Sequence, residues 1–105
     1  MLITNQKSYA TGDVLCFKIL NGDEIVAKLV DESADKYIIS RPCTVVPSHQ
    51  GLGLVQSLFS GDINTSIRLQ KSHVIMHSTV VSDIESHYIK TTTGIQTVGK
   101  GGIIT

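Results

Sequence analysis

Alternating apolar and polar positions in the first part of the chain predict short β-strands. Residues 14–20 form an almost continuous apolar run. The Asn-Gly-Asp sequence at residues 21–23 is typical of a tight turn, because Asn and Gly tolerate positive φ. Residues 24–30 alternate in part, as a half-buried strand does, and residues 36–40 are rich in β-forming side chains. We therefore expect an antiparallel meander built from these segments.

The segment that follows is less regular. Pro42 and Pro47 bracket a β-branched stretch, which is predicted to be a sheet edge or a strand end because proline lacks the N–H that a ladder needs. Residues 48–53 contain two glycines and predict a loop, whereas residues 52–59 are apolar and fit either a strand or a packed loop. Residues 63–69 alternate most cleanly between apolar and polar side chains, and they predict a further strand.

The remaining β pattern completes a small sheet. A polar break at residues 70–73 precedes a β-branched run at residues 74–81, which predicts a last strand or strand end. Together the segments predict a mainly β fold, a small and strongly bent antiparallel barrel of about five strands over residues 13–81. The length of 105 residues and the mass of 11.3 kDa are consistent with a single domain.

A helix is predicted after the barrel, over residues 82–93. Ser82 and Glu85 have the spacing of a capping box, in which each side chain binds a backbone N–H of the first turn. Gly94 is suited to the position that ends a helix. We expect the tail, residues 95–105, to be mobile or to add a strand to a neighbouring chain.

The charge of the chain narrows the classes of function. Nine Lys and Arg balance nine Asp and Glu, so the net charge is zero, and charged residues make up only 17% of the chain. A neutral monomer has little bulk attraction for phosphate, although local basic rims remain compatible with the composition. Low charge also favours self-association. With no Trp and 5% aromatic residues, the core is expected to be aliphatic.

No catalytic or metal-binding constellation is evident, so we expect neither an enzyme nor a cofactor. The sequence lacks GxSxG, P-loop and HExxH patterns. His73 and His77 lie on a predicted strand, where four residues span roughly 13 Å, which is too far for one metal ion.

The two cysteines and the hydropathy of the chain indicate the cellular compartment. Cys16 and Cys43 lack CxxC spacing and are expected to be reduced thiols in or near the core. No segment approaches the roughly 18 to 20 apolar residues of a membrane span, and residues 1–12 do not have the pattern of a signal peptide. We therefore expect a cytoplasmic protein with no membrane partner.

Two predicted loops carry side chains suited to nucleic acid. Sequence-tolerant binding of a single strand needs a basic track together with flat groups on which bases stack. The candidate residues are Asp35, Lys36 and Tyr37 in one loop, and Arg68, Gln70, Lys71 and His73 in the other. The alternative is that these residues have no binding role: Tyr37 packs in the sheet, and the cations are ordinary surface residues.

The order of these segments also follows a known family pattern. Leu20-Asn21-Gly22 resembles the turn of the family's first motif, and residues 25–30 resemble its second strand, with Ala27 in the place of a bend glycine. Residues 69–76 lie over the second motif, where Gln70 and Lys71 replace Arg-Gly. On these residues the chain resembles the Sm-like (LSm) domain, in particular the Sm-like proteins of marine cyanophages.

The resemblance implies an SH3-like or Sm-like barrel that assembles into a homo-oligomeric ring of about five to seven subunits. Strand 63–69 of one subunit would pair with residues 74–79 of the next. It further implies binding of single-stranded nucleic acid, with RNA favoured over DNA, and a role in RNA or DNA processing or as a chaperone. Lys71 or Arg68 would then substitute for the family's arginine. The alternative is a phage structural or assembly ring that binds no nucleic acid.

Overall fold

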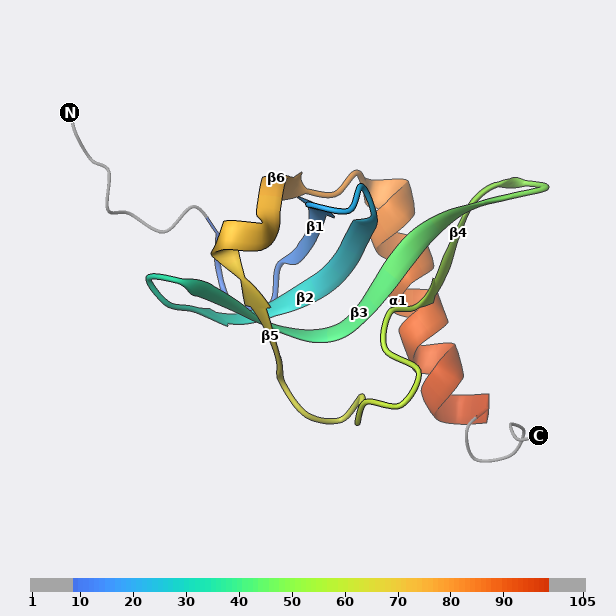
Figure 1. Ribbon diagram of the computed structural model, residues 1–105. Coiled ribbons are helices and arrows are strands. Elements are labelled where there is room, and N and C mark those ends of the chain that lie inside the picture. The colour runs from blue at the N-terminus through green and yellow to red at the C-terminus, as the bar shows by residue number, and fades with distance from the viewer. Residues whose placement is uncertain (1–8, 99–105) are drawn as a thin grey trace.

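The computed structural model describes residues 9–98 and shows a curled β-sheet with one long helix beside it (Figure 1). A 3-10 helix, η1, links the last two strands. The elements are β1 (Val14–Ile19), β2 (Glu24–Glu32), β3 (Lys36–Ser48), β4 (Gly51–Gln56), β5 (Ile67–Gln70), η1 (Lys71–His73), β6 (Val74–Thr79) and α1 (Ser82–Val98).

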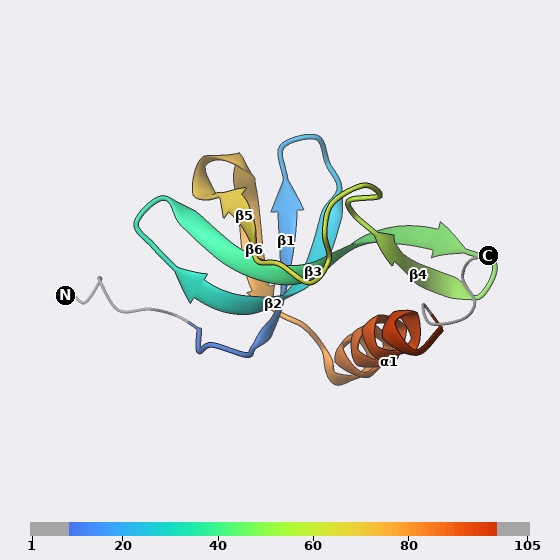
Figure 2. The same ribbon diagram turned by 90° about the horizontal axis from the view of Figure 1, so that it is seen from below.

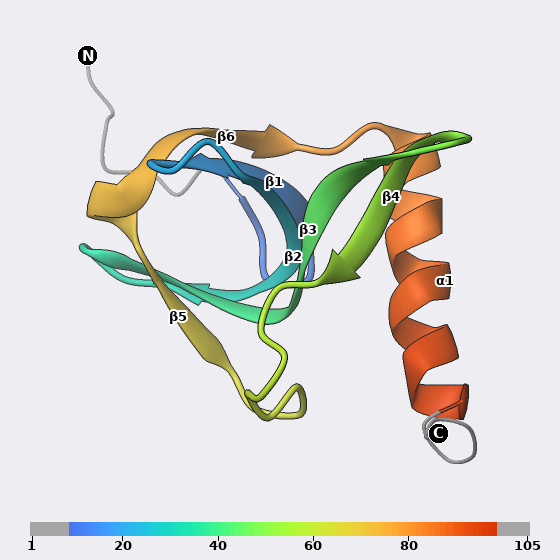
Figure 3. The same cartoon turned by 45° about the vertical axis from the view of Figure 1, so that its right-hand side comes forward.

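All strand pairs in the sheet are antiparallel, in the order β4-β3-β2-β1-β6, and β5 also pairs with β3. The sheet curls so that β5 and β6 lie at its two ends, joined by η1 (Figure 3). Among residues 9–98, no ladder joins β5 to β6, so the sheet is not closed. The predicted mainly β class with a C-terminal helix is thereby confirmed.

Strand β3 is much longer than residues 36–40, and it runs through both prolines. It continues past Pro42 because that residue lies in a bulge: Cys43 faces Val26 and Ser40 faces Lys28, which leaves an extra residue on β3. At Pro42 the prediction of a sheet edge or a strand end was therefore wrong. Beyond Thr44, β3 pairs with β4 but no longer with β2, so Pro47 lies where one edge of the strand is open and no N–H is needed.

The β3–β4 hairpin replaces the predicted loop at residues 48–53. Its turn is at residues 49–50, and Gly51 follows with a φ of +113°, which side chains rarely allow. The ambiguous segment 52–59 is a strand as far as Gln56. The hairpin extends beyond the curled part of the sheet and lies over α1 (Figure 2).

The predicted strand over residues 63–69 was wrong in its first half, because β5 begins only at Ile67. Asp62 forms a turn there instead. Its side chain accepts a hydrogen bond from the N–H of Asn64 at 2.9 Å, and its carbonyl accepts from the hydroxyl of Thr65 at 2.9 Å. These local hydrogen bonds prevail over the alternating pattern.

The helix begins at Ser82 as predicted, but its cap differs. The first intrahelical hydrogen bond joins Glu85 N–H to the carbonyl of Val81, which makes Val81 the N-cap and places Ser82 in the first turn. The helix does not end at Gly94 but continues to Val98. The predicted tail therefore begins within α1, and residues 99–105 lie outside the described residues.

The two faces of the curled sheet form two apolar clusters, as strand alternation requires. The inner cluster fills the concave side and consists of Leu15, Phe17, Ala27, Leu29, Tyr37 and Ile39. The outer cluster joins the sheet to α1 and consists of Val14, Val26, Cys43 and Tyr88, with Val45, Leu54 and Ile84 at its border. Each fully buried large side chain contributes about 1.5–3 kcal/mol to the stability.

Candidate nucleic-acid interface

The two loops predicted to bind nucleic acid lie side by side. Strands β3 and β5 pair so that Lys36 faces Gln70 and Ile38 faces Arg68. The backbone N–H of Lys71 donates to the carbonyl of Asp35 at 2.9 Å. One end of the sheet therefore carries most of the predicted site residues, from the turn between β2 and β3 and from β5 with the start of η1.

His73 lies at the other end of η1. Its carbonyl accepts a hydrogen bond of 2.9 Å from Leu20 N–H in the β1–β2 turn, and its side chain is exposed. It therefore belongs to the rim of the sheet near that turn, beside the cluster rather than within it.

The Asp35–Lys36 pair is at the surface. The Lys36 ammonium lies 3.2 Å from the Asp35 carboxylate, and the Ser33 hydroxyl donates to the same carboxylate at 3.1 Å. These contacts, that of Lys36 first, hold the pKa of the Asp35 carboxyl below its usual range. The turn is thus fixed by its own polar side chains, and the charge of Lys36 is locally compensated.

Tyr37 is a core residue and offers no surface for base stacking. Its exposed fraction is 4%, and its ring packs against Phe17 at 4.9 Å and His77 at 5.6 Å between centroids. Burial, and then the charge of Glu32, raise the pKa of its hydroxyl. The ring therefore supports the site from beneath, as the alternative interpretation of this residue anticipated.

Lys71 is held by an ion pair that the sequence did not reveal. Its ammonium lies 2.7 Å from Glu32 Oε2 and 5.0 Å from the centroid of the Tyr37 ring. The two charged side chains are 29% and 16% exposed. The other oxygen, Glu32 Oε1, is buried and has no hydrogen-bond partner among residues 9–98. Lys71 therefore fixes the position of η1 above β2, and most of its charge is already compensated.

Arg68 is the cation of this cluster that is most available to a ligand. The side chains of β5 alternate, with Ile67 and Leu69 packed against the inner cluster and Arg68 and Gln70 exposed. Within the described part of the chain, no carboxylate lies within 4 Å of the Arg68 guanidinium. It faces the solvent together with the amide of Gln70.

Glu32 is the residue that sequence reasoning missed. The alternating pattern predicted a strand that ends at residue 30, two residues before Glu32. The inward position of Glu32 depends on a shift of register between Leu29 and Asp31. No local signal predicts such a bulge, so the Glu32–Lys71 pair becomes visible only in the folded chain.

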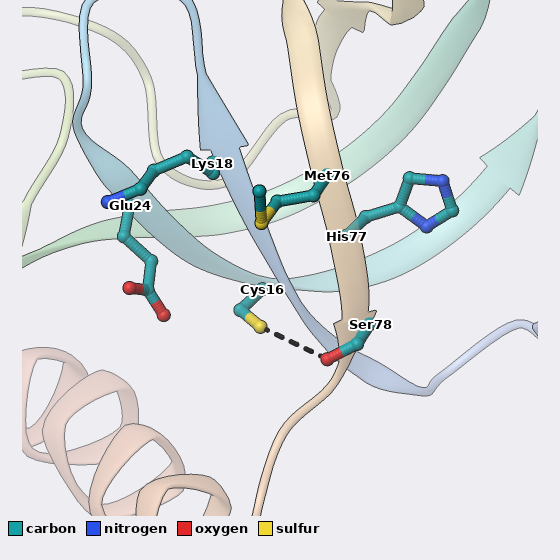
Figure 4. Close-up of a pocket in the computed structure, with 6 residues that line it drawn as sticks. All are labelled: Cys16, Lys18, Glu24, Met76, His77 and Ser78. Carbon is teal, nitrogen blue, oxygen red and sulfur yellow. Dashed lines mark hydrogen bonds between the residues drawn. The ribbon is translucent and has the colours of Figure 1, made fainter.

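A separate pocket of about 170 Å³ lies on the outer side of β1 and β6, lined by Cys16, Lys18, Glu24, Met76, His77 and Ser78 (Figure 4). In this view Cys16 and Ser78 approach each other, with 3.5 Å between Sγ and Oγ, while His77 points the opposite way. His77 instead accepts or donates a hydrogen bond of 2.7 Å to the Tyr9 hydroxyl. None of the predicted site residues lines this pocket.

Residues 9–98 contain no group of three or more His, Cys, Asp or Glu side chains placed to hold a metal ion. No helix in the same part of the chain is both long and apolar enough to cross a membrane. No protein-family model matches the sequence, and neither does any curated protein.

Proposed function

We propose that the chain is an Sm-like barrel protein that assembles into a ring in the cytoplasm and binds single-stranded nucleic acid, with RNA favoured over DNA. The order of the strands supports the barrel. Strands β1, β2 and β3 form a meander, β5 lies on the far side of β3, and η1 carries the chain back to β6 beside β1. The hairpin β3–β4 and the helix α1 are then additions to this barrel.

The two open edges support the ring. Among the described residues, β5 pairs with β3 alone and β6 with β1 alone, so each strand has an unpaired edge. Unpaired edges invite pairing with another chain, and joining β5 of one subunit to β6 of the next would cover both. A head-to-tail contact of this kind closes into a ring, and we expect about five to seven copies.

The observation that carries the binding proposal is the β3–β5 pairing, which gathers Lys36, Arg68 and Gln70 on one exposed surface. In a ring this surface recurs once per subunit, so a modest basic group becomes a repeated series of phosphate contacts. Arg68 would supply the main contact, while Lys71 and Tyr37 would hold the loop in position. Because Tyr37 is buried, binding would rest on phosphate contacts more than on base stacking.

The second candidate is a phage structural or assembly ring that binds no nucleic acid. Specific contacts favour it: Lys36 is paired with Asp35, Lys71 is paired with Glu32, and the aromatic ring of the site is buried. A surface built in this way offers less to a phosphate chain than its composition suggests.

Native mass spectrometry of the purified protein, with and without nuclease treatment, tests the assembly. A single closed species of about five to seven copies is expected. Additional mass that disappears after nuclease treatment would identify bound nucleic acid. A monomer or dimer at micromolar concentration would contradict the ring.

Fluorescence anisotropy with oligo-U and oligo-A at low salt tests the binding. Arg68→Ala should weaken the affinity about tenfold and flatten its salt dependence, since each subunit loses a phosphate contact. Lys90→Ala, on the exposed surface of α1, removes the same charge and should leave the affinity unchanged. Equal affinity of both variants would exclude Arg68 from the interface, and absence of saturable binding in the wild type would favour the assembly ring.

A further inference from the structure

A second pocket of about 170 Å³ lies between α1 and the sheet, away from the β3–β5 loops. On the sheet side it is lined by Lys28 of β2 and by Ser40 and Arg41 of β3. On the helix side its walls include Tyr88, Ile89 and Thr92. We refer to it as the helix–sheet pocket. Its volume is several times the roughly 30 Å³ that one water molecule occupies in the liquid, so it has room for a group of several heavy atoms.

The charge of the helix–sheet pocket is positive and uncompensated. No carboxylate lines it, and among residues 9–98 none forms an ion pair with Lys28 or Arg41. The Arg41 guanidinium makes one long hydrogen bond, 3.4 Å from Nη2 to the amide oxygen of Asn64, which leaves its other N–H groups available. Lys28 faces Ser40 across the ladder and Arg41 follows Ser40, so the two cations come from adjacent positions on neighbouring strands.

The backbone at this pocket is held in an unfavourable conformation. Arg41 has a φ of +49°. Among the described residues, it is the one residue other than glycine with a positive φ. The left-handed conformation costs a residue with a side chain roughly 1–2 kcal/mol. The extra residue of the β3 bulge lies at the same place, and bulges commonly redirect a side chain beside a functional site.

The helix fixes this bulge. The Tyr88 hydroxyl donates a shared hydrogen bond to the carbonyls of Ser40 and Arg41, at 3.0 Å to each oxygen. Tyr88 is 1% exposed, so the contact is shielded from water. The contact holds the β3 bulge against α1, beside the pocket that Lys28 and Arg41 both line.

We propose that the helix–sheet pocket is a binding site for a phosphate group, held by Lys28 and Arg41 with the Ser40 hydroxyl as a further donor. A guanidinium presents N–H groups in a fork that matches phosphate oxygens, and an ammonium adds a second positive charge. Two cations also match the charge of a phosphate monoester better than that of a single carboxylate. The site is distinct from the β3–β5 loops, so the inference does not depend on the proposed nucleic-acid binding.

The test is an amide NMR titration of the full-length protein with inorganic phosphate, at constant ionic strength maintained with chloride. Saturable shifts are expected for the amides of Lys28, Ser40 and Arg41 and for the facing part of α1. The double variant Lys28→Gln/Arg41→Gln should weaken phosphate binding at least about tenfold, because it removes both charged donors. Lys90→Gln, which removes one positive charge from α1 outside the pocket and is therefore matched to Lys28→Gln, should bind as the wild type does.

Lys28→Gln alone provides the measurement if the double variant does not fold, because Lys28 is exposed and leaves the bulge intact. Shifts spread evenly over the surface cations, or unchanged binding by Lys28→Gln, would overturn the proposal. Parallel titrations with a nucleoside 5′-monophosphate and with an oligonucleotide that lacks a terminal phosphate identify the source of the group. Shifts with the first alone assign a free phosphate monoester, and shifts with the second assign the backbone of a strand.

Discussion

Tyr88 joins the helix to the sheet through both its ring and its hydroxyl. Its ring belongs to the outer apolar cluster, and its hydroxyl reaches two backbone carbonyls of β3. Burial, and then the charge of Cys43, raise the pKa of this hydroxyl to about 12, although the charge of Arg41 acts in the opposite direction. The residue therefore combines apolar packing with a polar contact that satisfies backbone oxygens at an irregular place in the strand.

Tyr88→Phe should lower the free energy of unfolding by about 1–2 kcal/mol, because the carbonyls of Ser40 and Arg41 lose the hydroxyl donor and Arg41 keeps only the weak Cys43 thiol at 3.8 Å. Tyr37→Phe is the matched control. Tyr37 is a buried tyrosine of the same size, and its hydroxyl makes no hydrogen bond within residues 9–98. Urea unfolding followed by circular dichroism measures both. Equal losses for the two variants would show that the hydroxyl of Tyr88 contributes nothing specific.

Between elements, the Glu32–Lys71 pair fixes η1 to the end of β2. It connects the second strand of the meander to the 3-10 helix that leads into β6, two segments that are remote in the sequence. Because both side chains are mostly buried, removing one partner leaves a charge in a poorly solvated position.

Lys71→Met should therefore destabilise the protein by about 2 kcal/mol, whereas Glu32→Gln/Lys71→Met should recover part of this loss. A double-mutant cycle by urea unfolding measures the coupling. The exposed pair Asp35–Lys36 is the control, and Lys36→Met should change the stability little because solvent screens that contact. Additive effects of Glu32→Gln and Lys71→Met would mean that the pair is not a stabilising contact.

The sequence predicted the elements that depend on neighbouring residues, such as tight turns. It did not predict the elements that depend on contacts between distant parts of the chain. The β1–β2 hairpin was found because Asn21-Gly22 marks its turn and the strands flank it directly. The extension of β3 past Pro42 was missed because a bulge removes the need for an N–H there. The start of β5 was misplaced because the alternating pattern of residues 63–69 says nothing of the hydrogen bonds that Asp62 makes.

The same distinction applies to the candidate site. The sequence indicated which two loops carry cations, and the β3–β5 pairing brings them together. It could not show that Tyr37 is buried or that Glu32 compensates Lys71, since both depend on the curl of the sheet and on a register shift in β2. Pairing of charges across elements is a property of the fold and leaves no trace in local spacing.

At the scale of the whole molecule, buried weak acids make the free energy of unfolding depend on pH in the alkaline range. Burial raises the pKa of the Cys43 thiol from 9.0 to about 11, and that of the Tyr88 hydroxyl from 10.0 to about 12. The unfolded chain loses these protons at lower pH than the folded chain does. The stability from both groups is therefore complete below pH about 9 and is lost as the pH rises through about 11 to 12.

The urea midpoint measured in reducing buffer should accordingly fall steeply between pH 9 and about 12. Tyr88→Phe removes one of the responsible groups and should make the decline shallower. A midpoint that is independent of pH over this range would contradict the burial of these groups. A decline that is the same in Tyr88→Phe and in the wild type would instead assign the effect to other residues.

The pairing of β1 with β6 also has a consequence for the nascent chain on the ribosome. Cys16 meets Ser78, which is synthesised 62 residues later, so β1 emerges long before its second neighbour exists. During that interval β1 can pair with β2, but its other edge stays exposed to other chains. Strand β6 and α1 cover the sheet only after both have been synthesised. Slow synthesis of the residues between β1 and β6 would therefore lengthen the period in which this edge of β1 is open to other chains.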